Sequence, residues 1–391
     1  MTNANWNQLA GVLPQPPHWT IQWEKLDTTP LLPWIVRMQK TPQNPHWHEE
    51  GDVWTHTRMV CQALADHPDF RTLPDTQRET VFLAALLHDI GKVPATRLAD
   101  GVWTSPGHAR AGAKIARSLL WREFGLSGTG PLQTKREAIC TLIRYHALLP
   151  HLLDRDDPER QLTRTAAQGE FCPDFSLSLL KLLTDADILG RTAPDIQELL
   201  DEVSLSFSLA EELDICHHPL VFASPVTAFA YLSGRNVSPE QQLYDDTWGE
   251  VILMAGLPGT GKDSWIQAHC PQLPVVSMDE IRIRTGISPV GPQEEVVRLA
   301  SEMAKEYFRQ KQSFVWNATS ISQSLRQNQL NLFHRYHARV RICYLETDWE
   351  TGLARNRSRE ARVPPSTIER MLDSLEPPER WEAQTVEWHC V

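Results

Sequence analysis

A short glycine-rich loop constrains the fold of this chain more than any other feature. It follows an apolar run, VILMAG at 251–256, and precedes a segment with helical spacing, SWIQAH at 264–269. In the pattern G-x-x-x-x-G-K, glycines let backbone N–H groups curl around an anion, and the start of the helix adds its dipole. We therefore predict a loop that binds nucleotide phosphates, formed by Gly256, Leu257, Pro258, Gly259, Thr260, Gly261 and Lys262.

The surroundings of this loop favour an α/β domain. Short apolar runs at 251–256, 275–280, 313–320 and 340–346 alternate with helical segments, and 385–391 is a candidate for one more strand. Strands that alternate with helices form parallel sheets, because each helix returns the chain to the same edge. Residues 249–391 are therefore predicted to form a doubly wound parallel sheet with helices.

The N-terminal part has a different pattern. From residue 52 to about 190 the apolar spacing is helical, with buried helices predicted at 81–92 and 176–190, and 191–215 continues in this way. Residues 1–45 are rich in proline and tryptophan and are expected to be irregular. We predict an all-helical domain at 1–205, a connector at 206–248 and the α/β domain at 249–391, which makes an α plus α/β multidomain chain.

Composition and charge disfavour several classes of protein. Charged residues make up 22% and hydrophobic residues 41% of the 391 residues, as in globular proteins. The net charge of −11 disfavours a protein that coats a polyanion, but not one that grips only the end of a polyanion. The 7 cysteines form no CxxC pair, so neither a disulfide scaffold nor a structural zinc finger is expected. With no apolar run of membrane-spanning length and no signal-peptide pattern, a cytoplasmic protein is expected.

Two polar residues follow the second predicted strand in the pattern D-x-x-R. A carboxylate at Asp279 can accept a proton from an attacking hydroxyl, and Arg282, one helical turn later, can hold an acceptor phosphate. The alternative is a helix-terminal aspartate paired with a residue three positions on. After Lys262, where a serine or threonine usually contacts Mg²⁺, stand Asp263 and Ser264, and either of them can serve the metal.

Arginines near residue 355 form a second basic motif. Arg355 and Arg359 are four residues apart, so they would share one face of a helix and close over transferring phosphates. A solvated basic face is the alternative. Asn317 and Thr319 end the third predicted strand, at the edge where ligands bind in open α/β sheets. Both sets are therefore candidates for the same nucleotide site.

Together these motifs resemble the polynucleotide 5′-kinase family, which has a GxPGxGK loop, a D-x-x-R acceptor motif and a lid with R-N-x-x-R followed by V-P. The resemblance covers roughly residues 249–391. It implies that Asp279 is the general base for a 5′-OH and that Arg282 holds the phosphate on the 3′ side of that end. Arg355 and Arg359 would contact the phosphates of ATP, or of another NTP, bound with Mg²⁺. An aspartate after the loop lysine departs from the family pattern, which leaves the Mg²⁺ ligand open.

A set of histidines and aspartates marks the N-terminal domain. A carboxylate buried without a partner is strongly disfavoured, and a bound metal removes that cost. Imidazole and carboxylate ligands suit Mn, Fe, Co, Ni or Zn. A lone histidine is more often a surface residue than a ligand, so it is the combination that indicates a metal site. The candidate ligands are His56, His88, Asp89, His108, His146 and Asp187.

The order H…HD…H…H…D, ending in ADxxGR, resembles the HD phosphohydrolase superfamily over roughly residues 48–205. The resemblance implies one or two divalent metals that activate water for attack on phosphorus. One metal would be held by His56, His88, Asp89 and Asp187. A second, bridged by Asp89, would be held by His108 and His146. Lys92 and Arg191 are candidate phosphate contacts, and Asp185 competes with Asp187 as the last ligand. Three nearby histidines are not expected to be functional: His46, His48 and His151.

The order and size of the two domains resemble the bacterial HD-Pnk family. That resemblance implies an enzyme that heals RNA or DNA ends. The kinase would place the NTP γ-phosphate on a 5′-OH, and the HD domain would remove a 3′-phosphate, with 2′-phosphate and 2′,3′-cyclic phosphate as alternatives. A separate ligase could then join the ends.

Two other interpretations stay open at this point. One is a nucleotide phosphohydrolase fused to a small-metabolite kinase. The other is an ATP-gated regulatory switch whose HD domain senses a nucleotide. Lys262, Asp279 and the complete set of candidate ligands argue against the switch, because a degenerate domain is expected to have lost at least one of them.

Overall fold

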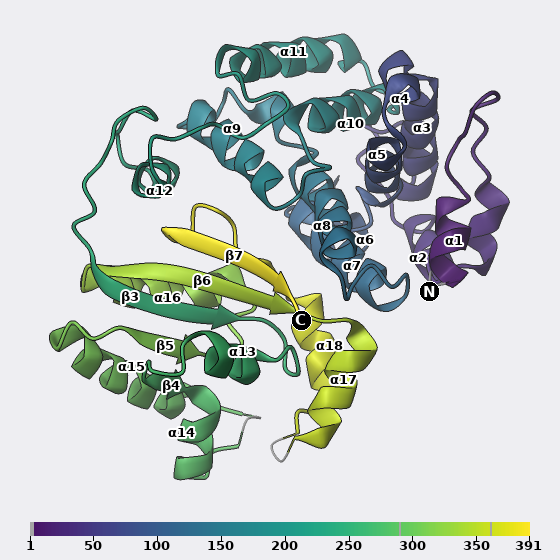
Figure 1. Ribbon diagram of the computed structural model, residues 1–391. Helices are drawn as coiled ribbons and strands as arrows, with labels where there is room; N and C mark the ends of the chain where they lie inside the picture. Colours follow the sequence, from purple (N-terminus) through teal and green to yellow (C-terminus); the bar gives the residue numbers. More distant parts are fainter. Residues whose placement is uncertain (1–3, 289–290, 360–361) are drawn as a thin grey trace. The chain divides into compact units, whose positions relative to one another are not determined.

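The computed structural model describes residues 4–288, 291–359 and 362–391 (Figure 1). The chain divides into two compact units, Met1–Leu126 with Pro131–Leu220, and Ser127–Gly130 with Val221–Val391. Helix α11 (Ile196–Glu212) runs across residue 205, where the sequence analysis ends the first domain. The arginine motif at 355–364 includes residues 360–361, which lie outside the described residues.

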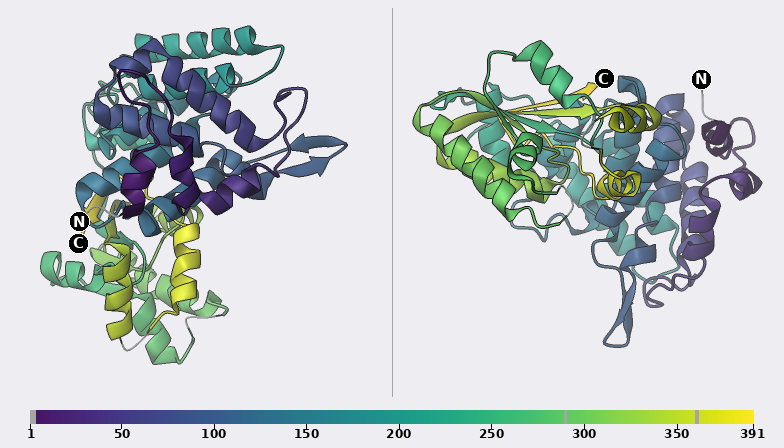
Figure 2. Two further views of the ribbon diagram at one scale, coloured as in Figure 1. Left: turned by 90° about the vertical axis from the view of Figure 1, so that its right-hand side faces the viewer. Right: turned by 90° about the horizontal axis from the view of Figure 1, so that it is seen from below.

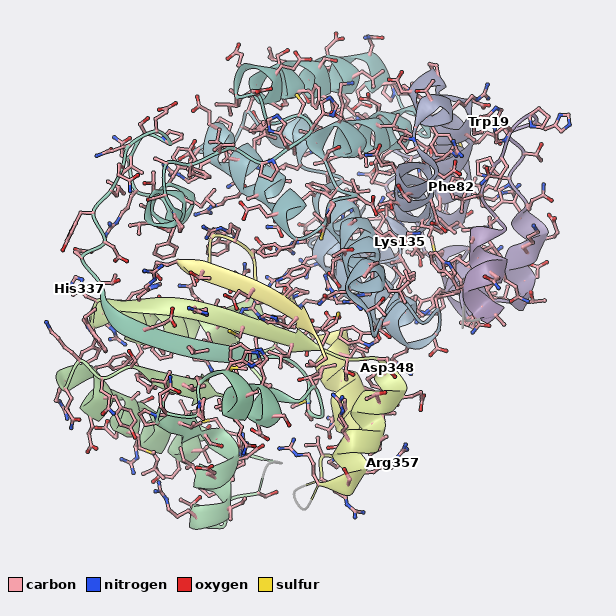
Figure 3. All side chains as sticks on the ribbon, viewed as in Figure 1. Trp19, Phe82, Lys135, His337, Asp348 and Arg357 are labelled. Atoms are coloured by element: carbon pink, nitrogen blue, oxygen red, sulfur yellow. The ribbon has the colours of Figure 1, made fainter. Side chains whose placement is uncertain are left out.

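The first unit is mainly helical, as the apolar spacing predicts. Its interior is formed where α3 (Val53–Asp66), α5 (Asp75–Leu87) and α10 (Leu177–Leu189) pack against one another. Phe82 of α5 is fully buried among these helices (Figure 3). Helix α3 begins where Asp52 accepts hydrogen bonds from the N–H groups of Trp54 and Thr55, which have no partner within the helix.

Shorter elements surround these helices. The remaining helical elements described in this unit are α1 (Ala4–Ala10), η1 (Trp23–Thr28), α2 (Leu32–Met38), α4 (Pro68–Thr72), α6 (Lys92–Ala95), α7 (His108–Arg122), α8 (Gly130–Tyr145), η2 (Leu149–His151), α9 (Pro158–Ala166) and η3 (Ala167–Glu170). Strands β1 (Arg97–Ala99) and β2 (Val102–Thr104) form an antiparallel hairpin, an addition to the predicted helical architecture. Figure 2 shows this hairpin standing out from the helices of its unit.

Two local predictions for this unit differ from the structure. The segment 1–45, expected to be irregular, contains α1 and α2, because Leu9, Ile35 and Met38 are buried and their packing outweighs local propensity. The helix expected at 81–92 ends at Leu87. The N–H of Ile90 donates to the carbonyl of Leu87 in a tight turn. His88 and Asp89 lie in that turn.

The second unit contains a parallel sheet whose strand order, within the described residues, is β4-β5-β3-β6-β7 (Figure 1). Its strands are β3 (Trp248–Ala255), β4 (Val275–Ser277), β5 (Phe314–Asn317), β6 (Ala338–Glu346) and β7 (Thr385–Cys390). Neighbouring strands are parallel throughout, with Val251 of β3 opposite Phe314 of β5 and Val340 of β6. The doubly wound prediction is confirmed, including the additional strand near residue 385.

Helix α12 (Pro225–Ser233) precedes the first strand of this sheet, and the other helices described in this unit connect its strands. They are α13 (Lys262–His269), α14 (Met278–Thr285), α15 (Glu294–Arg309), α16 (Gln323–Arg335), α17 (Trp349–Ser358) and α18 (Pro365–Asp373). Ile252 and Met254 of β3 pack with Trp265 and Ile266 of α13 in one buried cluster, which fixes the helix that follows the glycine loop. Within the described residues, none of the helices has both the length and the apolar character required to cross a membrane.

The parallel arrangement decides where the polar motifs meet. The carboxyl ends of β3, β4 and β5 lie at the same edge of the sheet. The glycine loop follows β3, Asp279 lies in the first turn of α14 after β4, and Asn317 is the last residue of β5. Three segments that are far apart in the sequence therefore converge at the edge where open α/β sheets bind ligands.

Candidate active sites

The glycine loop of the second unit joins β3 to α13, as predicted. Gly256, Gly259 and Gly261 have positive φ angles, which residues with a side chain rarely adopt. Lys262 donates hydrogen bonds of 2.9 Å to the carbonyl oxygens of Gly256 and Leu257. Burial lowers the pKa of Lys262 to about 8. An anion bound in the loop would replace these carbonyl acceptors and favour the charged lysine.

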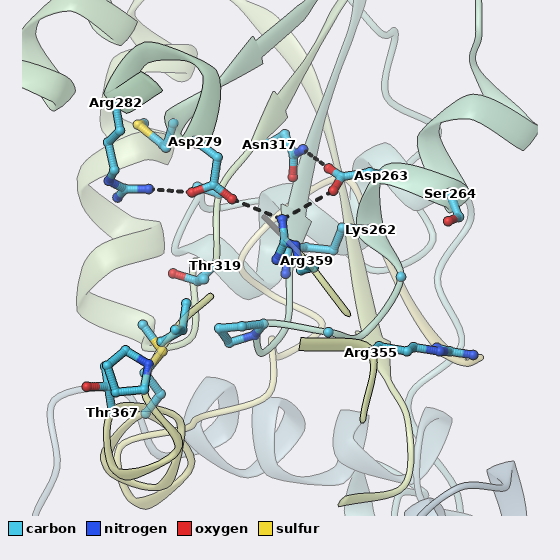
Figure 4. Close-up of a pocket in the computed structure, with 18 residues that line it drawn as sticks. Lys262, Asp263, Ser264, Asp279, Arg282, Asn317, Thr319, Arg355, Arg359 and Thr367 are labelled. Carbon is cyan, nitrogen blue, oxygen red and sulfur yellow. Dashed lines mark hydrogen bonds and ion pairs between the residues drawn. The ribbon is translucent and has the colours of Figure 1, made fainter. Parts of the chain in front are cut away.

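The loop forms one wall of a pocket of about 410 Å³ (Figure 4). The sequence-predicted residues that line it are Pro258, Gly259, Gly261, Lys262, Asp263, Ser264, Asp279, Arg282, Asn317, Thr319, Arg355 and Arg359. The other loop residues support it: Leu257 and Thr260 are buried, and Gly256 donates its N–H to the carbonyl of Thr319 at 2.8 Å. The predicted kinase motifs are therefore brought into one site.

Asp279 and Arg282 contact each other at this pocket. Ser277 caps α14 by accepting a hydrogen bond from the N–H of Glu280, which places Asp279 in the first helical turn. Arg282 Nη1 donates to Asp279 Oδ1 at 2.7 Å, and Arg282 Nε donates to Gln293 Oε1 at 2.8 Å. The two residues form the pair three positions apart that the sequence offered as the alternative. They also line the pocket, as a proton acceptor and a phosphate-binding arginine would.

Arg359 lies between two carboxylates. Its Nη2 is 3.2 Å from Asp279 Oδ2 and 3.5 Å from Asp263 Oδ2, and Figure 4 marks both contacts with dashed lines. Arg355 also lines the pocket. Its Nη1 lies beside Gly261, 3.6 Å from the position that a Cβ on this glycine would occupy. Besides Arg282, two arginines thus reach the pocket, Arg355 beside the glycine loop and Arg359 between the carboxylates.

The prediction that Arg355 and Arg359 share a helical face is wrong. Helix α17 ends at Ser358, and Arg359 has an extended backbone. The physical reason is a pair of hydrogen bonds between a side chain in the last turn of α17 and the backbone of a residue beyond the helix. Asn356 Nδ2 donates to the carbonyl of Val363 at 2.8 Å, and Asn356 Oδ1 accepts from the N–H of Val363 at 3.1 Å.

Asp263 has a polar neighbour in the pocket. Asn317 Nδ2 donates to Asp263 Oδ1 at 2.7 Å, whereas Figure 4 shows Ser264 apart from this group. Carboxylate, amide and water oxygens are the ligands that Mg²⁺ accepts. The geometry therefore favours Asp263 over Ser264 as the residue that serves the metal, with Asn317 beside it.

An apolar part of the same pocket was not anticipated. It is lined by Met278, Ala318, Val363, Pro364, Thr367 and Met371. The V-P pair after the arginine motif was a usable signal for two of these residues. Met371 gave none, because its place depends on how α18 packs rather than on any local pattern.

The six predicted metal ligands of the first unit come together in its interior. They are His56 on α3, His88 and Asp89 after α5, His108 at the start of α7, His146 after α8 and Asp187 on α10. Each histidine has its Nδ1 near a backbone carbonyl, and the four carbonyls belong to Gly190, Ala85, Ser105 and Ile143. A carbonyl can only accept, so Nδ1 carries the hydrogen, and in a neutral ring Nε2 presents a lone pair to the cluster.

The Nε2 atoms face each other in pairs. They are 3.2 Å apart in His108 and His146, and 3.4 Å apart in His56 and His88. Two such lone pairs repel each other unless a proton or a metal ion lies between them. Burial and then the neighbouring His108 and His88 lower the pKa of His146 to about 3, which disfavours the proton there at neutral pH. This cluster therefore fits a metal ion.

Asp89 lies between the two histidine pairs. It is 1% exposed, and neither carboxylate oxygen receives a well-oriented hydrogen bond from the described residues, although Lys92 Nζ approaches Oδ2 to 2.8 Å. Burial alone would raise the pKa of Asp89, but Lys92 and His88 outweigh it and hold the pKa well below its usual range. Oδ2 is 3.2 Å from His88 Nε2 and Oδ1 is 3.5 Å from His108 Nε2. A charged, buried carboxylate in this position can bridge two metals.

The ligand atoms form two groups, each with atoms within 4.8 Å of one another. One group is His56, His88 and Asp187, and the other is Asp89, His108 and His146. This arrangement accommodates one or two divalent metals. Asp187 Oδ1 is 3.0 Å from His56 Nε2, whereas Asp185 pairs with Lys181 at 2.5 Å. The structure thus places Asp187, rather than Asp185, in the cluster.

Two glycines allow the ligand-bearing segments to approach. A Cβ on Gly91 would lie 2.0 Å from the carbonyl oxygen of His108, and a Cβ on Gly190 would lie 2.6 Å from Val60. Such contacts are impossible without moving backbone. The glycines of HDIGK and ADxxGR therefore bring Asp89 to α7 and α10 to α3.

One carboxylate next to the cluster, Glu50, was missed. Glu50 Oε1 lies 2.7 Å from Nδ1 of His48 and 3.0 Å from Nδ1 of His56, and Glu50 Oε2 accepts from the N–H of Thr192 at 3.0 Å. Burial opposes the charge on Glu50, but these hydrogen bonds lower its pKa. A carboxylate that accepts from the far nitrogen of a ligand histidine orients that ring.

A cavity of about 650 Å³ opens beside the cluster. Both predicted phosphate contacts line it and are anchored on candidate ligands, with Arg191 Nη2 2.9 Å from Asp187 Oδ2 and Lys92 beside Asp89. Lys92 also donates to Gln43 Oε1 at 2.7 Å. His48 and His151, which were not expected to be functional, line the same cavity.

Comparisons with known proteins identify a domain in each unit. Residues 53–167 match the family model of the HD domain, and residues 251–378 match a family model described as an AAA domain. The chain therefore combines an HD domain, of the metal-dependent hydrolase type, with a P-loop kinase-like domain.

Two curated relatives share part of the sequence. One is a bifunctional uridylyltransferase/uridylyl-removing enzyme of Streptomyces coelicolor, 32% identical over 177 residues, which are 44% of this chain and 19% of that protein. The other is a multifunctional CCA protein of Halorhodospira halophila, 40% identical over 92 residues, which are 24% of this chain and 20% of that protein. The chain thus spans about one fifth of the length of these relatives.

Proposed function

We propose that this chain heals broken RNA ends, with one unit acting as a 5′-hydroxyl kinase and the other as a metal-dependent 3′-phosphatase. The observation that carries the proposal is the position of Asp279, which lies in the same pocket as Lys262 and is 2.7 Å from Arg282. A carboxylate and a cation beside a phosphate-binding loop suit an acceptor that has both a hydroxyl and a neighbouring phosphate. The 5′ end of a polynucleotide has both groups.

In the proposed kinase reaction, each side chain has a separate task. Asp279 accepts the proton of the 5′-OH while the oxygen forms its bond to the γ-phosphorus and the bond to the leaving NDP breaks. Lys262 and Arg359 contact phosphate oxygens and stabilise their charge. Asp263 and Asn317 would hold Mg²⁺, which, when bound with the NTP, neutralises phosphate charge.

In the proposed phosphatase, the cluster of histidines and aspartates would hold one or two divalent metals. When bound, such metals stabilise the charge on phosphate oxygens. Lys92 and Arg191 orient the phosphate by donating to its oxygens. The Streptomyces relative is named for uridylyl removal, which is also a cleavage at phosphorus and supports this chemistry. The 3′-phosphate is the primary substrate proposed, with 2′-phosphate and 2′,3′-cyclic phosphate as alternatives.

A second candidate is a nucleotide phosphohydrolase joined to a small-metabolite kinase. Two observations favour it. The pockets, of about 410 and 650 Å³, have sizes that hold single small ligands. The net charge of −11 gives the chain as a whole no attraction for a polyanion.

One experiment separates the two candidates. An RNA strand with a 5′-OH and a 3′-phosphate is incubated with γ-labelled ATP, Mg²⁺ and Mn²⁺ or Ni²⁺, and both ends are analysed. A labelled 5′ end and a 3′-OH are expected, which makes the strand a substrate for a separate ligase. Parallel incubations replace the RNA with nucleosides and mononucleotides. Labelling or dephosphorylation of these small molecules alone would contradict the RNA proposal.

A further inference from the structure

Two tryptophans line the cavity beside the metal-ligand cluster. Trp47 lies on the loop 42–52, and Trp103 lies on strand β2. Trp47 is 42% exposed, and Trp103 is half-buried. Keeping apolar indole surface in water costs free energy, so a ligand that covers two such residues in one cavity would be stabilised by them.

The loop that carries Trp47 is fastened to the cluster on both sides. Before the tryptophan, Gln43 Oε1 accepts a hydrogen bond from Lys92 at 2.7 Å. After it, Glu50 Oε1 lies 3.0 Å from Nδ1 of His56. The polar side chains of the loop thus point to the cluster and hold the backbone in place, while the indole is left at the cavity.

The hairpin that carries Trp103 is fastened in a similar way. Two residues later, the carbonyl of Ser105 accepts from Nδ1 of His108 at 2.9 Å, and the Ser105 hydroxyl bonds with Thr96 at 2.8 Å. Although the hairpin stands out from the helices of its unit (Figure 2), its base is tied to a candidate metal ligand. Each of the two segments therefore holds its own indole at a fixed position relative to the cluster.

We propose that Trp47 and Trp103 stack on the base of the nucleotide whose phosphate is held at this cluster. The inference rests on the proposed phosphatase function and names its substrate as a nucleotide unit rather than any phosphate ester. Stacking on an aromatic ring tolerates every base, because each base has a π face. Such a subsite suits the ends of strands of any sequence.

Negative charge on another wall of the cavity limits how much of an RNA strand enters. Glu198 and Glu202 of α11 line the same cavity and are exposed. Their carboxylates repel phosphates beyond the one at the cluster. The cavity therefore suits the terminal nucleotide alone, with the rest of the strand outside.

The test compares two RNA strands that both end in a 3′-phosphate, one with a normal terminal nucleotide and one whose terminal ribose lacks the base. Wild-type protein is expected to prefer the base-bearing end. Trp47→Ala and Trp103→Ala should each raise KM for that end on the order of 5–150-fold, the range for losing one stacked base. KM for the abasic end should not change. Trp47→Phe and Trp103→Phe keep an aromatic face and should retain most of the preference.

Matched controls lie on the same two segments. Val102→Ala alters the neighbouring residue of β2, whose side chain points to the other face of the hairpin, and Glu49→Ala alters an exposed residue of the loop. Both should keep the wild-type preference. Alanine variants of the tryptophans that also keep it, or a wild-type protein with no preference, would overturn the proposal.

A result with no phosphate release from either strand would count against the proposed phosphatase instead. The subsite is then judged from equilibrium binding of the same two strands to the full chain. Tighter binding of the base-bearing strand, lost in Trp47→Ala and Trp103→Ala, would support it. Equal binding of the two strands would overturn it.

Discussion

Arg359 and Asp279 form an ion pair of 3.2 Å between the end of α17 and the first turn of α14. The same guanidinium lies 3.5 Å from Asp263, so one cation occupies the space between the proposed proton acceptor and the proposed Mg²⁺ ligand. When Mg²⁺ and NTP bind, the ion pair between Arg359 and Asp263 would weaken, because the metal attracts Asp263 and the phosphates attract Arg359. Each of these side chains has its own proposed task, and a mutation can test each task.

Asp279→Ala should reduce 5′-phosphorylation by about 10²–10⁴-fold, the usual contribution of a positioned proton acceptor. ATP binding should change little, because Asp279 does not belong to the glycine loop. Asp279→Asn keeps the shape of the side chain and should be equally slow. Initial rates with a 5′-OH oligonucleotide provide the measurement, and 3′-phosphate release is the control. A variant that phosphorylates at the parental rate would remove this role from Asp279.

Arg282 and Arg359 should fail in different ways. Arg282→Ala should raise KM for the acceptor strand, and Arg282→Lys should restore only part of it, because a lysine cannot reproduce the guanidinium fork. Arg359→Ala should instead lower kcat at saturating acceptor. A lost hydrogen bond to a charged group costs about 1.5–3 kcal/mol, or roughly 10–150-fold in either constant. The same kinetic pattern in both variants would contradict the assignment.

Asp263→Ala should raise the Mg²⁺ concentration needed for half-maximal kinase activity, because Asp263 and Asn317 lie together in the pocket. The rise should be about tenfold or more, the loss typical even for residues that only orient a ligand. Ser264→Ala is the matched control and should behave like wild type. Mg²⁺ titrations at fixed ATP give the answer, and a larger effect in Ser264→Ala would reverse the choice between the two.

The strands and the glycine loop could be predicted because their signals are local. An apolar run followed by G-x-x-x-x-G-K reports a strand, a turn and a helix start within about 20 residues. The position of Arg359 could not be predicted in this way. It depends on the hydrogen bonds between Asn356 and Val363, which end the helix before Arg359 and break the expected i,i+4 face.

The metal-ligand cluster was predicted from its residue types and order, whereas its support was not. Glu50 contacts Thr192 across 142 positions of sequence, so no periodicity links them. Trp47 is similar, because its place at the cavity follows from the bonds that fasten the loop 42–52 to the cluster. Packing between distant segments decides such contacts, and a single sequence carries little record of it.

Asp89→Ala should lose bound divalent metal and 3′-phosphate release while keeping kinase activity. Asp89 lies between both histidine pairs, so its loss weakens each ligand group. Asp187→Ala should lose the metal of its own group, and Asp185→Ala, whose carboxylate pairs with Lys181, is the control that should keep it. Metal content after dialysis, measured by elemental analysis, decides between them. Full metal content in Asp89→Ala would contradict the predicted cluster.

The junction of α7 and α8 contains a buried charge network that predicts acid sensitivity. Arg117 Nη2 donates to Glu137 Oε2 at 2.7 Å, and Arg136 Nε donates to Glu137 Oε1 at 2.7 Å. Burial would raise the pKa of Glu137, but the two arginines outweigh it and lower the pKa. The network therefore stabilises the fold fully above the unfolded-state pKa of about 4.3, and this contribution is lost as the pH falls through the lower folded-state pKa.

Glu137→Gln should lower the free energy of unfolding around this junction by about 3–5 kcal/mol at neutral pH, because two arginine charges stay buried after their carboxylate is gone. The difference from wild type should shrink in acid, where wild type protonates Glu137 as well. Hydrogen exchange of α7 and α8 amides in urea, at neutral pH and in acid, measures both effects. Asp66→Asn, which breaks an exposed pair with Arg71, is the control and should cost at most about 1 kcal/mol. Equal protection of these amides in Glu137→Gln and wild type at neutral pH would show that the network does not stabilise the junction.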